Sequence, residues 1–132
     1  MILFSFVGYN NPEKENHCGL FLAKSDGKYG YIDKTGTYVI NPQFEDATHF
    51  SEGLAAVKIR SGSTGKWGYI DKAGKIVINP QFDDAKDFSE GLAAVRIGDN
   101  YGYIDKTGTY VINPQFDDAE DFSEGLETKL TF

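Results

Sequence analysis

The chain has few of the residues that carry most enzyme and metal chemistry. It contains one cysteine, Cys18, and two histidines, His17 and His49, among 132 residues. A single cysteine excludes an intrachain disulfide and favours a reducing compartment. There is no glycine-rich phosphate loop and no zinc-ligand spacing. We therefore predict that the protein is not an enzyme, with no cofactor and no metal site.

Cations and long apolar segments are also scarce. The chain has 13 Lys and Arg against 20 Asp and Glu, a net charge of −7 and a pI near 4.7. This balance disfavours nucleic acid and anionic membranes as partners and suits a basic partner.

The opening segment 1–7 is apolar, but it has no basic leader and is too short to span a bilayer. We interpret it as a strand. No signal peptide is evident, which slightly favours the cytoplasm. The alternative is a trimmed signal peptide or a lost upstream segment.

What the chain does have is one block of about 24 residues that occurs three times, at 30–53, 68–91 and 102–125. The first and third copies agree at 21 of 24 positions and the second and third at 20. Such repetition means that each unit packs on its neighbours and presents the same surface again. We predict one domain over 1–132, divided into an N-terminal strand and cap (1–18), three repeats (19–53, 54–91 and 92–125) and a capping strand (126–132).

Each unit is predicted to be a three-stranded antiparallel β-meander followed by a crossover. In the third unit the strands are expected at 92–97, 101–105 and 109–112. Asn113 and Pro114 are expected to end the last strand, because proline cannot donate to a β-ladder. Residues 117–119 are expected to form one helical turn. No stretch shows a sustained 3.6-residue pattern, so we expect almost no other helix.

Apolar residues fall on both faces of the first strand of each unit, with Ala93 and Val95 on one face and Leu92 and Ala94 on the other. The sheets should therefore be covered on both sides, with the crossover phenylalanines as part of the cover. We predict an all-β fold, a short open solenoid-like stack that residues 126–132 cap. The alternative is a ring or barrel closed by pairing of the strands at the two ends of the chain.

The repeat resembles the bacterial WG-repeat (or KWG-repeat) family. The second copy contains KWGYIDK at 66–72, IVINPQF at 76–82 and FSEGLA at 88–93. The match covers roughly residues 19–132. Trp67 is the only tryptophan, and Tyr29 and Tyr101 stand in its place in the other copies. The resemblance implies β-rich repeats with no general activity, and it brings no catalytic residues.

The crossovers are rich in carboxylates. Such clusters can hold calcium, but the alternating Asp pattern of a calcium loop is missing, and His49 stands where the other copies have Asp87 and Asp121. A catalytic carboxylate pair needs two unlike environments, which threefold repetition makes improbable. We interpret the crossovers as a solvated acidic surface. The aspartates that begin the hairpin loops should bind backbone N–H groups; they are Asp33, Asp71 and Asp105.

The repeats differ in length only at residues 60–67, where a Gly/Ser insertion is expected to form an exposed loop. We predict a scaffold that binds a protein partner, with a basic bacterial partner favoured and no nucleic acid or membrane. The alternative is a glycan- or cell-wall-binding module in which exposed aromatic residues stack on sugars, although core packing of the same rings is also open. The predicted binding residues are Arg60, Lys66, Trp67, Asp83, Asp84 and Asp87.

Overall fold

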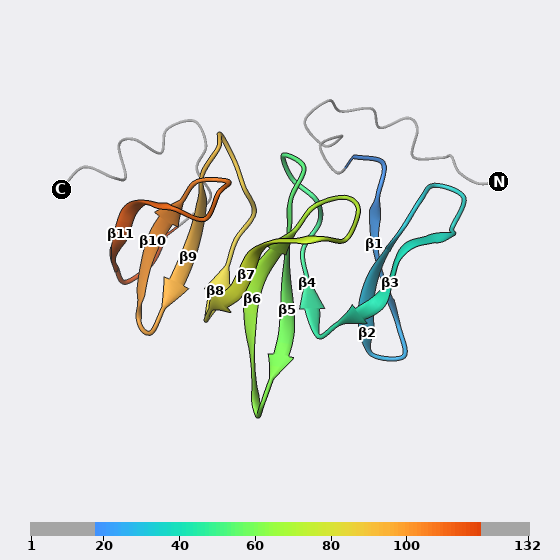
Figure 1. Ribbon diagram of the computed structural model, residues 1–132, viewed down its shortest axis with the longest axis horizontal. Coiled ribbons are helices and arrows are strands. Elements are labelled where there is room, and N and C mark those ends of the chain that lie inside the picture. Colours follow the sequence, from blue (N-terminus) through green and yellow to red (C-terminus); the bar gives the residue numbers. More distant parts are fainter. Residues whose placement is uncertain (1–17, 120–132) are drawn as a thin grey trace.

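The protein is all-β, as predicted. The computed structural model describes residues 18–119, and these contain strands and turns but no helix (Figure 1). The helical turn expected at 117–119 is absent, because these residues form a bend and irregular chain. The strands are β1 (Phe21–Ser25), β2 (Lys28–Ile32), β3 (Tyr38–Phe44), β4 (Asp46–Ala47), β5 (Ala55–Ser61), β6 (Thr64–Ile70), β7 (Ile76–Phe82), β8 (Asp84–Ala85), β9 (Ala93–Ile97), β10 (Asn100–Ile104) and β11 (Tyr110–Phe116).

The strands form three antiparallel sheets, with the orders β1-β2-β3, β4-β5-β6-β7 and β8-β9-β10-β11. Each sheet is a meander, as the short turns predicted. The chain passes from one sheet to the next through a single residue, Glu45 before β4 and Asp83 before β8. The second and third sheets therefore each begin with a two-residue strand, β4 or β8, in a segment that we predicted to be part of the crossover.

The last strand of each sheet continues through its Asn-Pro pair, so the strand end predicted there was wrong. Proline is tolerated because these are edge strands, in which a missing N–H removes no ladder bond. The ladder also shifts at this point: Trp67 pairs with Phe82 but Tyr69 pairs with Ile78, which leaves a bulge in β7 opposite Gly68. A Cβ on Gly68 would lie 2.5 Å from the Ile78 carbonyl oxygen, so only glycine fits.

The hydrophobic core lies between facing sheets. Along β5, Val57 packs toward the first sheet and Ala56 toward the third, which confirms that a sheet is covered on both sides. Phe50 and Phe88 of the crossovers are buried, and Phe50 meets Tyr31 edge-to-face with ring centroids 4.8 Å apart. Each such burial contributes about 1.5–3 kcal/mol. A sheet therefore draws much of its stability from its neighbours.

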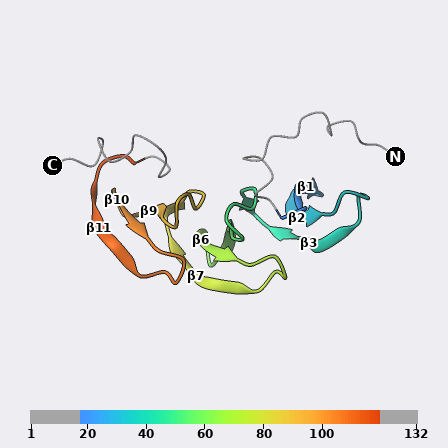
Figure 2. The same cartoon turned by 90° about the horizontal axis from the view of Figure 1, so that it is seen from above.

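The three sheets stand in a curved row, with the first and third at opposite ends (Figures 1 and 2). The described residues form an open array and no closed barrel. The two terminal strands predicted from the sequence, within 1–18 and at 126–132, fall outside the described residues, apart from Cys18.

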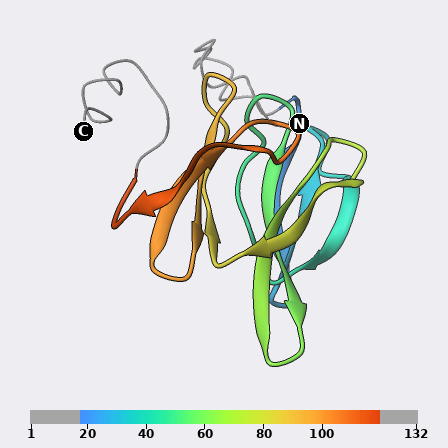
Figure 3. The same cartoon turned by 60° about the vertical axis from the view of Figure 1, so that its left-hand side comes forward.

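The insertion at 60–66 forms a longer hairpin and not a loop. β5 and β6 stay paired out to Ser61 and Thr64, so only the two residues 62–63 make the turn. Figure 3 shows this hairpin extending beyond the rest of the array. The added residues continue the β5–β6 register, with Arg60 opposite Gly65 and Ser61 opposite Thr64.

Candidate functional site

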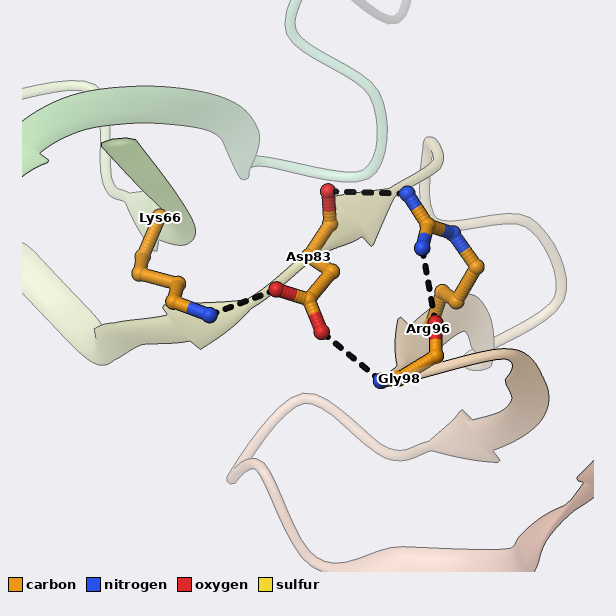
Figure 4. A network of polar contacts seen from close by, with 4 residues as sticks. All are labelled: Lys66, Asp83, Arg96 and Gly98. Atoms are coloured by element: carbon orange, nitrogen blue, oxygen red, sulfur yellow. Dashed lines mark hydrogen bonds and ion pairs between the residues drawn. The ribbon is translucent and has the colours of Figure 1, made fainter. Parts of the chain in front are cut away.

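Asp83 is the centre of a polar network that joins the second and third sheets (Figure 4). Lys66 Nζ on β6 donates to Asp83 Oδ1 at 2.5 Å, and the Gly98 N–H donates to Asp83 Oδ2 at 2.7 Å. Arg96 on β9 donates from Nη2 to the Asp83 carbonyl oxygen at 3.3 Å and from Nη1 to that of Gly98 at 2.7 Å. The bond from Lys66, then that from Gly98, lowers the pKa of the Asp83 carboxyl. These contacts fix one sheet against the next.

Arg60 on β5 binds Glu45, the residue that links the first and second sheets. Its Nη2 lies 2.5 Å from Glu45 Oε2, and the Glu45 N–H donates to the Lys58 carbonyl oxygen at 3.0 Å. The Arg60 side chain is 61% exposed, so this ion pair contributes at most about 1 kcal/mol. Glu45 occupies the same place in its unit as Asp83, but its cation lies on the sheet that follows the link, whereas Lys66 lies on the sheet that precedes Asp83.

Asp84 and Asp87 have contacts of their own. The Tyr101 hydroxyl donates to Asp84 Oδ2 at 2.7 Å, and burial together with this bond raises the pKa of Tyr101. Asp87 is half-buried beside Thr48 and His49 of the preceding crossover, and burial raises its pKa. The structure therefore brings Lys66 and Asp83 together but gives the other two acids separate partners.

Trp67 belongs to the core. Only 8% of it is exposed, and it packs with Tyr69 and Phe82 in the layer between the second and third sheets. Tyr101 at the equivalent position is 9% exposed, and Tyr29 is half-buried. A ring covered by the next sheet offers no face to a sugar or a peptide. The structure thus contradicts a surface-binding role for Trp67.

The loop aspartates have the structural role that was predicted. Asp33 Oδ1 accepts the N–H of Thr35 at 2.8 Å and that of Thr37 at 3.1 Å. Asp105 accepts the equivalent N–H groups of the third hairpin. The Thr35 hydroxyl, followed by these N–H groups, lowers the pKa of Asp33.

Sequence reasoning missed a turn that links successive units. Ser51 and Leu54 exchange backbone bonds of 2.8 and 3.1 Å around two residues with φ of 57° and 85°, the signature of a type I′ turn. Glu52, the first of these two, accepts the Glu90 N–H at 2.6 Å and the Gly91 N–H at 2.9 Å in the next turn. The repeated Glu-Gly pair before a strand was the available signal.

A second missed feature is a row of exposed side chains on the outer side of the array. The edge strands β3, β7 and β11 lie along this side (Figure 2). Their valines Val39, Val77 and Val111 are 52%, 42% and 55% exposed. The alternate residues that follow are also exposed: Asn41, Gln43, Asn79, Gln81, Asn113 and Gln115. We call these nine residues the outer rim.

The outer rim is also protected against strand pairing. Gln81 Nε2 donates to the Asn79 carbonyl oxygen at 3.1 Å, and Gln43 bonds Asn41 in the same way at 3.0 Å. Together with the proline in each strand, these bonds occupy backbone groups that a foreign strand would need. The rim is therefore suited to side-chain contact more than to strand addition.

Residues 18–119 contain neither a candidate metal site nor a candidate membrane-spanning helix. No group of three or more His, Cys, Asp or Glu side chains in that span could hold a metal ion. No helix there has the length and apolar character needed to cross a membrane.

The fold and these contacts define a repeat protein of packed antiparallel sheets linked through equivalent residues. The family described as WG containing repeat matches residues 29–61, 67–101 and 101–126. The chain belongs to this family. In the structure, the tryptophan of the family name is a core residue, and the glycine beside it faces the bulge. Comparisons with curated proteins and with solved structures gave no match.

Proposed function

We propose that the chain is a non-catalytic scaffold that binds another protein through the outer rim. The observation that carries this proposal is the threefold repetition of an exposed valine, Val39, Val77 and Val111, at equivalent places on adjacent sheets. Single exposed aliphatic residues are ordinary, but an aligned row on packed sheets supplies the apolar centre that interfaces use. Because the sheets are fixed against each other, the row is already in position before a partner arrives.

The partner is proposed to be basic. The chain carries a net charge of −7, which attracts a cationic protein and speeds its encounter with the rim. Asp83 and Glu45 are engaged within the array, so the attraction rests on other carboxylates. The exposed ones are Asp26, Asp46, Glu90, Asp99, Asp117 and Asp118.

Catalysis and sugar binding receive less support. Lys66, Asp83 and Arg96, the most conspicuous polar group, are all committed to holding the sheets together. The rings of Trp67 and Tyr101 on which a sugar would stack are covered. The rim is a surface that the array repeats and leaves exposed, and its valines give it an apolar centre.

The test is affinity capture from a lysate of the source cell, with captured proteins identified by mass spectrometry. The variant Val39→Thr/Val77→Thr/Val111→Thr keeps side-chain shape and strand preference but makes the row polar. We expect wild type to retain a basic protein and the triple variant to lose most of it. The matched control is Ile97→Thr, because Ile97 is 40% exposed but lies outside the rim. Equal capture by the triple variant and wild type would contradict the proposal.

A second arm tests the site predicted from the sequence. Replacing residues 60–66 by Gly-Asp-Asn installs the shorter turn that the third unit already uses. This change removes Arg60 and Lys66 but leaves the rim intact, so capture should persist. Loss of capture in this variant with retention in the rim variant would place the site on the β5–β6 hairpin.

Added salt should slow association of the partner with the chain, because salt screens exposed charges.

A further inference from the structure

Among the described residues, the first sheet has one strand fewer than the other two. In the second sheet β4 pairs with β5, with Asp46 opposite Lys58, and in the third β8 pairs with β9, with Asp84 opposite Arg96. In the first sheet β1 has β2 as its only strand neighbour among the described residues. By repeat alignment, Lys24 of β1 occupies the place of Lys58 and Arg96.

The segment that would supply this strand lies at the other end of the array. Asp118 and Ala119 follow β11 as Asp46 and Ala47 follow β3. The Ala119 N–H donates to Asp118 Oδ1 at 2.8 Å, the same local bond that Ala47 makes to Asp46 at 2.9 Å. Within the described residues, 118–119 belong to no sheet.

The apolar faces of the first and third sheets also match each other, as the missing strand and the unpaired segment among the described residues do. Ile70 and Ile104 face the preceding sheet and are fully buried, whereas Ile32 at the equivalent place in the first sheet is only half-buried. Ile78 faces the following sheet and is 3% exposed, whereas Ile112 in the third sheet is half-buried. The array thus ends in the two halves of the interface that it uses twice internally.

We propose that a second copy of this chain docks head to tail on these ends. Residues 118–119 of one copy add to β1 of the other, with Asp118 opposite Lys24 and Ala119 opposite Ala23. The face around Ile112 packs on the face around Ile32. This contact between copies would repeat the contact between successive sheets of one chain: the same backbone pairing, the same opposite charges and the same packing of apolar faces. Because it joins unlike faces of a curved array, it builds closed rings or chains of copies, not face-to-face pairs. This self-association is separate from partner binding by the rim.

The test blocks one end at a time and measures mass in solution by sedimentation across a range of concentrations. Wild type should associate as concentration rises. Ile32→Asp and Ile112→Asp should each be monomeric, because each variant lacks one half of the proposed head-to-tail interface. An equimolar mixture of the two should form a one-to-one complex, since the intact Ile112 end of one variant meets the intact Ile32 end of the other.

Val39→Asp is the matched control and should associate like wild type, because Val39 is exposed on the rim and not at an end. If an isoleucine variant fails to fold by circular dichroism, Lys24→Glu and Asp118→Lys test the same ends at exposed positions. Each should weaken association, and their combination in one chain should restore it.

Three results would overturn the proposal: a monomeric wild type, in which the chain's own terminal segments complete the ends; a single-end variant that still dimerises; or a mixture that forms no complex.

Discussion

At the scale of single residues, Glu52 combines local strain with a contact between units. A non-glycine residue in the left-handed region costs about 1–2 kcal/mol, and Glu52 has a φ of 57°. In this conformation its carboxylate accepts the Glu90 and Gly91 N–H groups and lies 3.5 Å from Lys106 Nζ. Bonds to a charged acceptor are stronger than neutral ones and offset the strain.

Replacing Glu52 by Gln should therefore destabilise the array. The amide keeps one acceptor oxygen but loses the charge, so we expect the free energy of unfolding to fall by about 1–2 kcal/mol. Urea denaturation at neutral pH measures this. The control is Asp99→Asn, because Asp99 is exposed and has no side-chain bond or ion pair within residues 18–119. Equal stability of the two variants would show that the glutamate contact contributes nothing.

The lowered pKa of Asp83 predicts how the stability of the fold depends on pH. Its pKa in the folded protein lies below the ordinary 3.8, so ionisation favours folding. The contribution is fully present above pH 3.8 and is lost as pH falls through the lowered pKa. Asp83→Asn should therefore reduce stability at neutral pH and flatten its decline in acid. Thermal unfolding between pH 7 and about pH 2 checks this, and parallel curves for variant and wild type would be contrary to it.

At the scale of elements, a bulge opposite a glycine interrupts the ladder of the last strand in each sheet, and in β7 it lies opposite Gly68. A Cβ there would meet the backbone of Ile78 at 2.5 Å and Pro80 at 2.7 Å, and neither can yield without shifting β7. At Gly65 a Cβ would meet the Glu45 carboxylate at 2.6 Å, which is the far end of a flexible side chain. Two glycines of one strand thus differ in what surrounds them.

Gly68→Ala should lower the free energy of unfolding by about 3 kcal/mol, because overpacking against fixed backbone is relieved only by moving it. Gly65→Ala is the matched control and should change stability by less than about 1 kcal/mol. Chemical denaturation of both variants makes the comparison. A small loss in Gly68→Ala would mean that the bulge is not required by the fold.

The sequence predicted the elements well where repeats and hairpin signals were strong. The meander order and the buried crossover phenylalanines such as Phe50 and Phe88 followed from spacing and parity. The strand end at Pro114 was wrong because proline stops a central strand but not an edge strand, and a sequence alone does not say which strand is the edge. β4 and β8 were missed because two residues are too few to show an alternating pattern.

At the scale of the whole molecule, the candidate site was harder to predict, because exposure depends on how sheets face each other. Trp67 was named as a binding residue because it is the only tryptophan, with core packing left open, and the next sheet covers it. Lys66 and Asp83 were both named, but their pairing across the joint depends on the fold. The rim valines were not singled out, since nothing in an apolar run marks the side that no sheet covers.

Hydrogen–deuterium exchange of the chain, alone and with its captured partner, tests the central claim most directly. Binding through the outer rim should slow exchange in β3, β7 and β11 together, because those three strands carry Val39, Val77 and Val111. Exchange in the β5–β6 turn at 62–63 should stay unchanged. Protection confined to that hairpin and to the joint at Asp83, with none on the three edge strands, would contradict the account.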